Sequence, residues 1–563
     1  MDRRTTLSKM FGQHVSDKKV ATAPAPAATA VLSGLAPYMG AFEFEQAAHL
    51  LRRTTFGPTY QQIKDAVNDG LDATLQKLLE DRPLPDGPLN HRYENDPEVP
   101  IGEIWANKIY QPQPLRNEIR NYRRQSLNAW NVELLRKSGV SIIEKMTLFW
   151  HNHYVTANIN DPNYTYNYIT TLRENALGNV RELAKIMTVN PSMLRYLNGR
   201  ENSRVAPNEN YARELLELFT IGKGPVAGPG DYTNYTEDDV VAMAKVLTGW
   251  RDVGYFNMNP DIPMPFGRYV NNRHDTGDKT LSYRFDNQVI PNMGADEYKH
   301  LIDIIFSKDE CARFICRKLY RWFVYYVITD EIEQDVIEPM AQVMIANDYE
   351  IKPALDALLR SEHFFDMLSI GPMIKNPIDF VFSVLNIFEV EYNDANLEAY
   401  YRLQLRTVGQ PLEQMQMVPF NPPSVAGWKA YYQEPGFYRV WISSATLPPR
   451  MNFSNQMLGE GVGQGANRAA IDVLKFTASI DDPFDPNHLI DEFAKILYPQ
   501  PIPQGQKDLL KSILLPGLPD FEWTVEYGDY VNNPDDEEIA ASVADKLKNL
   551  LTAMLSMPEF YLS

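Results

Sequence analysis

The clearest fold signal in the chain is the stretch TEDDVVAMAKVLTG at residues 236–249. Thr236 is a favoured helix N-cap residue, and the three acidic residues after it suit the positive end of the helix dipole. Apolar residues then recur at intervals of three and four, and Gly249 can adopt the left-handed conformation that ends many helices. The stretch therefore predicts a helix over about 237–248 whose buried face is formed by Val240, Met243, Ala244 and Leu247.

The same helical periodicity covers most of the chain. It is visible at residues 44–51, 63–78, 114–156, 296–390 and 453–563. Hydrophobic residues make up 44% and charged residues 23% of the sequence, as in globular proteins, which excludes a disordered or collagen-like chain. We therefore predict a mainly α fold, a large multi-helix array with long irregular loops and at most short β-hairpins.

Three regions are expected along the chain. Residues 1–38 form a flexible tail or a vestigial export signal, because an Ala/Pro-rich composition cannot build a core. Residues 39–390 form the main helical body, in which the Asn/Pro/Asp/Gly-rich loop 251–292 carries site residues. Residues 391–563 form a C-terminal helical part with a Pro/Gly/Trp loop at 409–452, packed on the main body.

Charge and hydropathy limit the partners and the location. The net charge of −19 repels phosphate backbones and anionic lipid, so no nucleic-acid partner is expected. No run of 18 apolar residues occurs, so no membrane span is expected. Arg3 and Arg4 resemble the start of a twin-arginine export signal, but polar residues separate them from the apolar stretch that such a signal needs. The protein is expected in the periplasm or cell envelope if this signal works, and in the cytoplasm otherwise.

The first candidate site is the stretch WHNHY at residues 150–154. His151 and His153 are two residues apart, so on a continuous helix they point about 200° away from each other. Imidazole is a common metal ligand, and both residues are candidate ligands, although one metal could join them only if the helix ended between them. The alternative is that each imidazole is a buried structural side chain.

The second candidate is the stretch PNENYARELLELF at residues 207–219. At about 100° per residue, its polar side chains gather within an arc of about 140°, opposite an apolar face. Carboxylates there can act as acid and base, and a guanidinium can hold an anionic group. The alternative is a solvated surface with Glu/Arg pairs. We expect catalytic roles for Glu209, Arg213 and Glu214, and substrate contacts from Asn208 and Asn210.

Two further candidates lie in loops. His274 and Asp275, beside a glycine and a second aspartate, can supply metal ligands or a catalytic acid and base, although polar loops often carry no function. Trp428 closes the stretch NPPSVAGW at residues 421–428, and it either lines a binding cleft for substrate or anchors the loop to the core. Phosphate-loop, nucleophile-elbow, HExxH and dinucleotide signatures do not occur in the sequence.

These stretches, with HLLRRTTFGP at residues 49–58, LRENALGN at 172–179 and PEF at 558–560, make the chain similar to a known bacterial family. The sequence resembles the family called domain of unknown function 1800, and the matching stretches span nearly the whole chain after residue 40. The resemblance implies a mostly helical bacterial protein, often predicted to be exported, with no established catalytic residues. It also implies a neighbouring gene of a second family, domain of unknown function 1501, which looks like phosphatases and sulfatases.

Two functions follow from these residues. The first is an enzyme whose His/Glu/Asn/Arg site, assembled from the four segments, performs metal-assisted hydrolysis with a divalent metal ion as cofactor. Copper or iron would accept the same ligands. The second is a non-catalytic scaffold or chaperone that binds the phosphatase/sulfatase-like neighbour, with the polar residues forming a buried, satisfied network.

Overall fold

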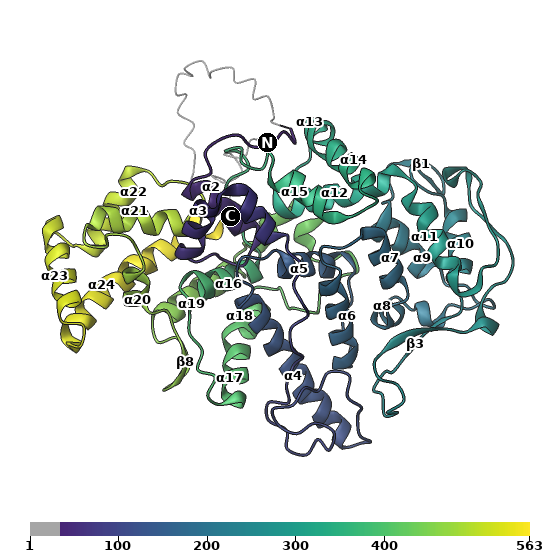
Figure 1. Cartoon of the computed structure of the whole chain (residues 1–563), viewed down its shortest axis with the longest axis horizontal. Coiled ribbons are helices and arrows are strands. Elements are labelled where there is room, and N and C mark those ends of the chain that lie inside the picture. The colour runs from purple at the N-terminus through teal and green to yellow at the C-terminus, as the bar shows by residue number, and fades with distance from the viewer. Residues whose placement is uncertain (1–33) are drawn as a thin grey trace.

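The computed structural model describes residues 34–563 (Figure 1). Over these residues the chain is 55% helical, and its sheets are all two-stranded and antiparallel. The predicted mainly α fold class is confirmed. Arg3 and Arg4, on which the export signal depends, lie outside the described residues. Within the described part, none of the helices combines the length and the apolar composition that crossing a bilayer needs.

The first described residues already pack on the main body. Pro37 forms an antiparallel bridge with Ser361, and the main-chain nitrogen of Tyr38 donates to the carbonyl oxygen of Arg360 at 2.9 Å. Pro37 and Tyr38 belong to residues 1–38, the region that we expected to be a flexible tail or a vestigial export signal. The chain then enters the helices α2 (Phe44–Thr54) and α3 (Tyr60–Leu78).

The centre of the molecule is built on α4 (Leu115–Arg136), α5 (Ile143–His153) and α6 (Pro162–Glu174). Helix α5 is buried on nearly all sides, because Glu144 and Lys145 are buried together with the predicted apolar stripe. A helix buried all round has no face in water, so its polar side chains need partners inside the protein.

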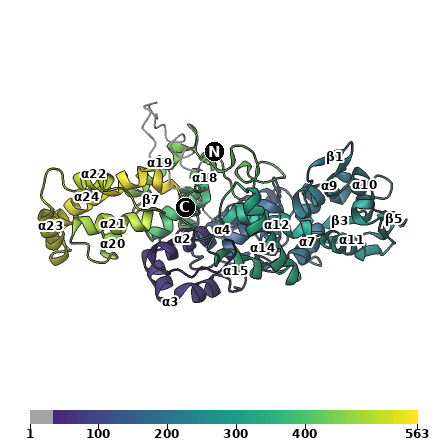
Figure 2. The same ribbon diagram turned by 90° about the horizontal axis from the view of Figure 1, so that it is seen from above.

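One end of the elongated molecule carries short helices and hairpins (Figures 1 and 2). Helix α10 (Glu237–Val246) begins at Thr236 with a capping box, and Gly249 has a φ of +94°, so the predicted helix is confirmed. Two short hairpins lie in and around the loop 251–292, in agreement with the predicted short β-hairpins. The elements here are β1 (Val226–Gly228) with β2 (Asp231–Tyr232), β3 (Trp250–Val253) with β4 (Phe266–Tyr269), β5 (Lys279–Thr280) with β6 (Val289–Ile290), α7 (Val180–Thr188), α8 (Pro191–Tyr196), α9 (Glu209–Glu214) and α11 (Glu297–Phe306).

The helix expected at residues 207–219 changes its pitch half-way. Helix α9 ends at Glu214, and the chain continues as a π-helix over Leu215–Thr220. The hydroxyl of Thr220 donates to the carbonyl oxygen of Leu215 at 2.6 Å. A uniform 100° per residue is therefore wrong after Leu215, because a π turn contains more residues than an α turn.

The remaining helices return to the centre and then form the other end of the molecule. One hydrophobic core runs from α2 to the last residues of the chain, and Arg53 in α2 donates to the hydroxyl of Ser563 at 2.8 Å. The two described ends of the chain therefore meet at the centre (Figure 1). The elements are α12 (Asp309–Phe323), α13 (Asp330–Ile332), α14 (Glu338–Ala346), α15 (Ile351–Leu359), α16 (Pro377–Ile387), α17 (Leu397–Gln404), α18 (Gln410–Gln414), α19 (Leu447–Leu458), β7 (Val462–Gln464) with β8 (Asn467–Ala469), α20 (Val473–Ala478), α21 (Pro486–Leu497), α22 (Gln504–Leu514), α23 (Asp520–Asn532) and α24 (Glu537–Ser556).

Candidate functional site

His151 lies in the last turn of α5 and is buried. The hydroxyl of Tyr168 contacts its Nδ1 at 2.8 Å and donates to the carbonyl oxygen of Tyr154 at 2.5 Å. Because the hydroxyl hydrogen is used in that bond, Nδ1 of His151 carries the imidazole hydrogen, and Nε2 is left as an acceptor. This Nε2 has no partner among the described residues. Burial lowers the pKa of His151 to about 3, so the ring is neutral at physiological pH.

His153 has a different set of partners. Its Nε2 lies 3.1 Å from the carbonyl oxygen of Phe219, and Lys318 donates to its Nδ1 at 3.0 Å. Burial, followed by the charge of Lys318, holds the pKa of His153 well below its usual value. Both ring nitrogens are therefore occupied. In the part of the chain that the structure describes, no three His, Cys, Asp or Glu side chains are grouped so that they could hold a metal ion. The structure thus provides no ligand set for the metal predicted at His151 and His153.

The polar side chains of α9 form hydrogen bonds and ion pairs with other residues of the same protein. Arg213 makes two hydrogen bonds of 2.8 Å to Glu237 at the start of α10, and Glu209 lies 3.4 Å from the same guanidinium. The side chain of Asn208 caps α9 by accepting from the main-chain nitrogen of Asn210 at 2.9 Å. These contacts join α9 to α10 and occupy the guanidinium that we expected to hold a substrate anion.

Glu214 is the member of this face whose carboxylate forms no hydrogen bond with the described residues. Its side chain is half-buried, and burial, followed by the charge of Glu217, raises its pKa. Glu217 accepts from the hydroxyl of Tyr235 at 2.5 Å and lies 3.4 Å from Lys223. Asn210 donates from Nδ2 to the carbonyl oxygen of Leu197 at 3.1 Å. Of the residues predicted here, Glu214 therefore keeps the greatest freedom to contact another molecule.

The pair His274 and Asp275 is divided between two environments. Nε2 of His274 lies 3.0 Å from Oε2 of Glu297 in α11, and the ammonium of Lys279 lies 2.6 Å from Oε1 of the same carboxylate. The side chains of Lys279 and Glu297 are fully buried. Asp275 instead accepts from the main-chain nitrogen of Gly277 at 2.9 Å, within its own turn. His274 is therefore part of a buried triad with Glu297 and Lys279. Asp275 lies at its edge, because Lys279 donates to the carbonyl oxygen of Asp275 and lies 3.9 Å from its carboxylate.

Trp428, a predicted substrate-binding residue, lies beside the predicted metal ligand His151. The centroid of its ring lies 5.6 Å from that of His151, and its main-chain nitrogen donates to Oδ1 of Asn152 at 2.9 Å. Gly427 has a φ of +91°, and a Cβ there would lie 2.3 Å from the same oxygen. Three of the four predicted segments thus meet at the end of α5, with Trp428 beside His151 and the π turn after α9 beside His153. His274 instead contacts Glu297.

Two large cavities lie at the C-terminal end of α4, away from these residues. They have volumes of about 660 and 570 Å³ and share Lys137 and Ser138 in their walls. Sequence reasoning missed both, because their linings come from separate segments without a common motif. The sequence feature that could have indicated the first cavity was the stretch at residues 49–58, because Thr55, Phe56 and Gly57 line this cavity.

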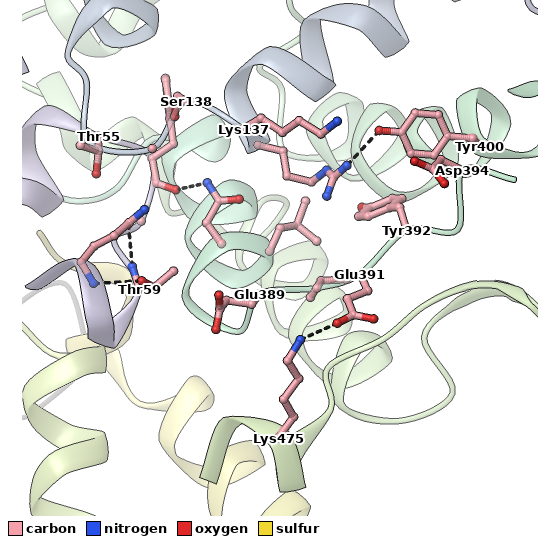
Figure 3. A pocket seen from close by; sticks show the side chains of 18 residues that line it. Thr55, Thr59, Lys137, Ser138, Glu389, Glu391, Tyr392, Asp394, Tyr400 and Lys475 are labelled. Atoms are coloured by element: carbon pink, nitrogen blue, oxygen red, sulfur yellow. Dashed lines mark hydrogen bonds and ion pairs between the residues drawn. The ribbon is translucent and has the colours of Figure 1, made fainter. Parts of the chain in front are cut away.

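The wall of the first cavity combines both charges with aromatic rings (Figure 3). Lys475 forms an ion pair with Glu391. Arg136 donates to the hydroxyl of Tyr400 at 3.1 Å and lies over the ring of Tyr392, 4.2 Å from its centroid. Nε of Arg136 is buried and has no partner among the described residues. The cavity therefore offers donors, acceptors and flat apolar surface together.

The second cavity contains two carboxyl groups in contrasting surroundings. Glu144 is buried and accepts from Nε of Arg173 at 2.7 Å. Burial raises its pKa, and the charge of Arg173 opposes this effect only in part. Glu133 is more exposed and accepts from the hydroxyl of Tyr400 at 3.0 Å and from Lys137 at 2.5 Å. A buried carboxyl with a raised pKa and a second, more exposed one thus line the same cavity.

Comparison with known proteins assigns the chain as a whole. The model of a family described as protein of unknown function, DUF1800, matches residues 49–562. The chain belongs to this family. No curated protein matches it, and no solved structure matches it. Membership confirms the resemblance found in the sequence. In this DUF1800 chain, two of the matching stretches line the cavities, with Phe56 in the first and Arg173 in the second.

Proposed function

We propose that this DUF1800 protein binds a neutral polyhydroxylated ligand, of the saccharide class, in the two cavities beside α4 and hydrolyses a glycosidic bond in it. The observation that carries the proposal is Glu144, a buried carboxyl with a raised pKa in the wall of a ligand-sized cavity. Cavities of 300–1,000 Å³ are the usual size of small-molecule sites, and pairs of carboxyls in contrasting surroundings are typical of acid–base enzymes.

The lining of the cavities favours an uncharged polar ligand. Five basic and seven acidic side chains line the two cavities, so neither sign of charge dominates strongly enough to select an ion. Paired donors and acceptors suit hydroxyl groups, which both donate and accept. Aromatic side chains add flat apolar surfaces on which the C–H face of a sugar ring can pack. These are Trp130 and Tyr401 in the second cavity, and Tyr392 and Tyr400 in the first.

The two carboxyls suit the two halves of glycoside hydrolysis. In its protonated form, which the raised pKa favours relative to a free carboxyl, Glu144 donates its proton to the departing glycosidic oxygen while the bond from that oxygen to the anomeric carbon breaks. Glu133, as a carboxylate, accepts a proton from the water that adds to the anomeric carbon. The hydrogen bond of 2.7 Å from Arg173 fixes the orientation of Glu144. Atoms balance, because one water is consumed and one hydroxyl appears on each product.

The test uses the purified full chain and a panel of neutral oligosaccharides. Calorimetry measures binding, and the release of reducing ends measures hydrolysis. We expect Glu144→Gln to lower hydrolysis by about 10²–10⁴-fold, the usual contribution of a general acid, while binding stays within a few-fold of the wild type. Glu338→Gln is the matched control, because it loses a pair with Arg313 outside both cavities. No binding by any oligosaccharide, or unchanged hydrolysis in Glu144→Gln, would refute the proposal.

This mechanism differs from the metal-assisted hydrolysis that the sequence suggested. In the described residues, His153 has both ring nitrogens occupied and Arg213 is paired with Glu237, which leaves that version with less support. Metal analysis of the purified chain separates the two versions. Stoichiometric metal that is lost in a His151→Ala variant would favour the metal-dependent one.

A second candidate function is that of a scaffold for the phosphatase/sulfatase-like partner. Apolar side chains stand exposed where α22 and α23 form one end of the molecule, and such patches often mark protein contacts. Leu509, Phe521 and Val525 are 61%, 61% and 55% exposed. A pull-down with the neighbouring protein tests this role. Complex formation that is lost in Phe521→Ser would support it, whereas no complex with the wild type would exclude it.

A further inference from the structure

Helix α23, at one tip of the molecule, presents apolar side chains to water (Figures 1 and 2). Phe521 and Val525 are 61% and 55% exposed, and because they lie four residues apart they share one side of the helix. Leu518, just before α23, is 47% exposed. The ring of Phe484 is 36% exposed and flanks this side, 4.0 Å from where a Cβ on Gly528 would lie. Together, Leu518, Phe521, Val525 and Phe484 form a surface that we call the apolar stripe.

The helix that carries the stripe is held firmly by its other side. Trp523 and Tyr527 lie opposite the stripe and are buried, and Nε1 of Trp523 donates to the carbonyl oxygen of Pro483 at 2.8 Å. An ion pair between Glu526 and Lys546 joins α23 to α24. The stripe is therefore a fixed surface, and its side chains are not needed for the core. Exposed apolar patches of this kind often mark contacts with other proteins.

Acidic side chains border the stripe. The 30 residues from Pro516 to Asp545 contain nine Asp or Glu residues and no Lys, Arg or His. Within α23, Asp520 and Glu526 are paired with lysines. Glu522 and Asp529 form no ion pair with the described residues, and around the helix axis they lie within about 40–100° of the stripe residues. Two carboxylates without a counter-charge therefore stand along one edge of the stripe.

This combination of charge and shape restricts the partner. A second copy of the chain would bring the same acidic border against this one, and anionic lipid would be repelled in the same way. A basic partner would instead form ion pairs at the border while it buried the apolar residues. Gly528 adds no side chain to this side of α23, so a second helix can approach closely and pack alongside it.

We propose that the apolar stripe and its acidic border bind an amphipathic helix of a partner protein, with apolar side chains on one face and Lys or Arg along its edges. The apolar face packs on Phe521 and Val525, and the basic side chains pair with Glu522 and Asp529. This inference rests on the second candidate function, that of a scaffold, and gives the chemistry of the segment that the partner must contain. It does not depend on the proposed saccharide hydrolysis.

The test uses the purified full chain and a synthetic probe, a peptide of about 18 residues, or five helical turns, made of leucine and lysine. Its leucines recur at intervals of three and four, so they form one face of a helix. Calorimetry is expected to show one peptide bound per chain, more weakly as the salt concentration rises. A control peptide in which glutamate replaces every lysine should not bind. Sedimentation of the protein alone shows whether two copies associate.

Substitutions in the stripe test the apolar contact. Phe521→Ser should weaken peptide binding about tenfold or more, because aromatic side chains at the centre of an interface carry much of its binding energy. The melting temperature should stay at the wild-type value, because Phe521 is exposed. Phe266→Ser is the matched control. Phe266 is 41% exposed in β4, at the other end of the molecule, and its loss should leave the Kd unchanged.

Substitutions in the border test the charge contact. Glu522→Gln combined with Asp529→Asn should weaken binding about two- to fivefold for each carboxylate, the usual contribution of exposed ion pairs, and should reduce the salt dependence. Asp261→Asn combined with Asp278→Asn is the matched control. It changes the net charge by the same amount in the loop 251–292, far from α23, and should leave the Kd unchanged (Figure 1).

The proposal is overturned if the leucine–lysine peptide does not bind, or if Phe521→Ser or the change at Glu522 and Asp529 keeps the wild-type Kd. Association of two copies that is lost in Phe521→Ser would also overturn it, because the stripe would then be a self-contact. The pull-down with the neighbouring protein judges the scaffold role separately. Peptide binding at the stripe without that complex would uphold this inference and reject that partner, and a complex without peptide binding would do the reverse.

Discussion

Replacing Glu297 with alanine removes the carboxylate nearest to the buried ammonium of Lys279. The two charges lie 2.6 Å apart and both side chains are fully buried, so water cannot replace the lost partner. The same change removes the acceptor for Nε2 of His274 at 3.0 Å. Breaking one partner of a buried ion pair typically costs about 3–5 kcal/mol, because the other charge stays buried and unpaired. We therefore expect Glu297→Ala to lower the free energy of unfolding by about that amount.

Urea unfolding followed by tryptophan fluorescence measures this loss, with Glu338→Ala as the control. Glu338 is also paired with an arginine, Arg313, but their side chains are 39% and 28% exposed, and such surface pairs contribute about 0.2–1 kcal/mol. Glu297→Gln, which keeps an acceptor and the volume, should lie between the wild type and Glu297→Ala. A loss in Glu297→Ala no larger than that in Glu338→Ala would refute the description of the triad as a buried, mutually dependent network.

Two more predictions follow from backbone geometry and from burial. Gly427→Ala should lower the free energy of unfolding by at least about 1–3 kcal/mol in chemical denaturation, because φ is +91° and the new Cβ would meet Oδ1 of Asn152 at 2.3 Å. Gly505→Ala, in the first turn of α22 with open space around it, should be neutral or stabilising by about 0.4–1 kcal/mol, and an equal loss in both variants would contradict this reasoning. Burial lowers the pKa of four imidazoles below the usual 6.5, so the folded state takes up fewer protons than the unfolded state as the pH falls. Stability that is fully present above pH 6.5 should therefore decrease towards pH 4, by up to about 1.4 kcal/mol per pH unit for each ring, and a melting temperature unchanged between pH 7 and 5 would argue against it. The four residues are His49, His91, His151 and His153.

The contacts of His151 and His153 show where sequence reasoning was sufficient and where it was not. The opposite orientation of His151 and His153 follows from helical geometry, and their separate partners agree with it. The identity of those partners does not follow, because Tyr168, Phe219 and Lys318 lie 17, 66 and 165 residues away along the chain. A side chain's role depends on what it contacts, and sequence spacing predicts only the contacts within one element.

The sequence by itself determined the helical elements, since caps and periodicity are local: Thr236 and Gly249 mark the two ends of α10 in the sequence and in the structure. It did not determine the π turn after Glu214, which depends on packing around Leu215–Thr220. Only the tertiary structure decided which charges are buried together. Glu297 reaches Lys279, and Asp379 reaches Lys145, across 18 and 234 residues, because burial of the apolar faces fixes the helices first and leaves each charged group only the partners that lie within its reach.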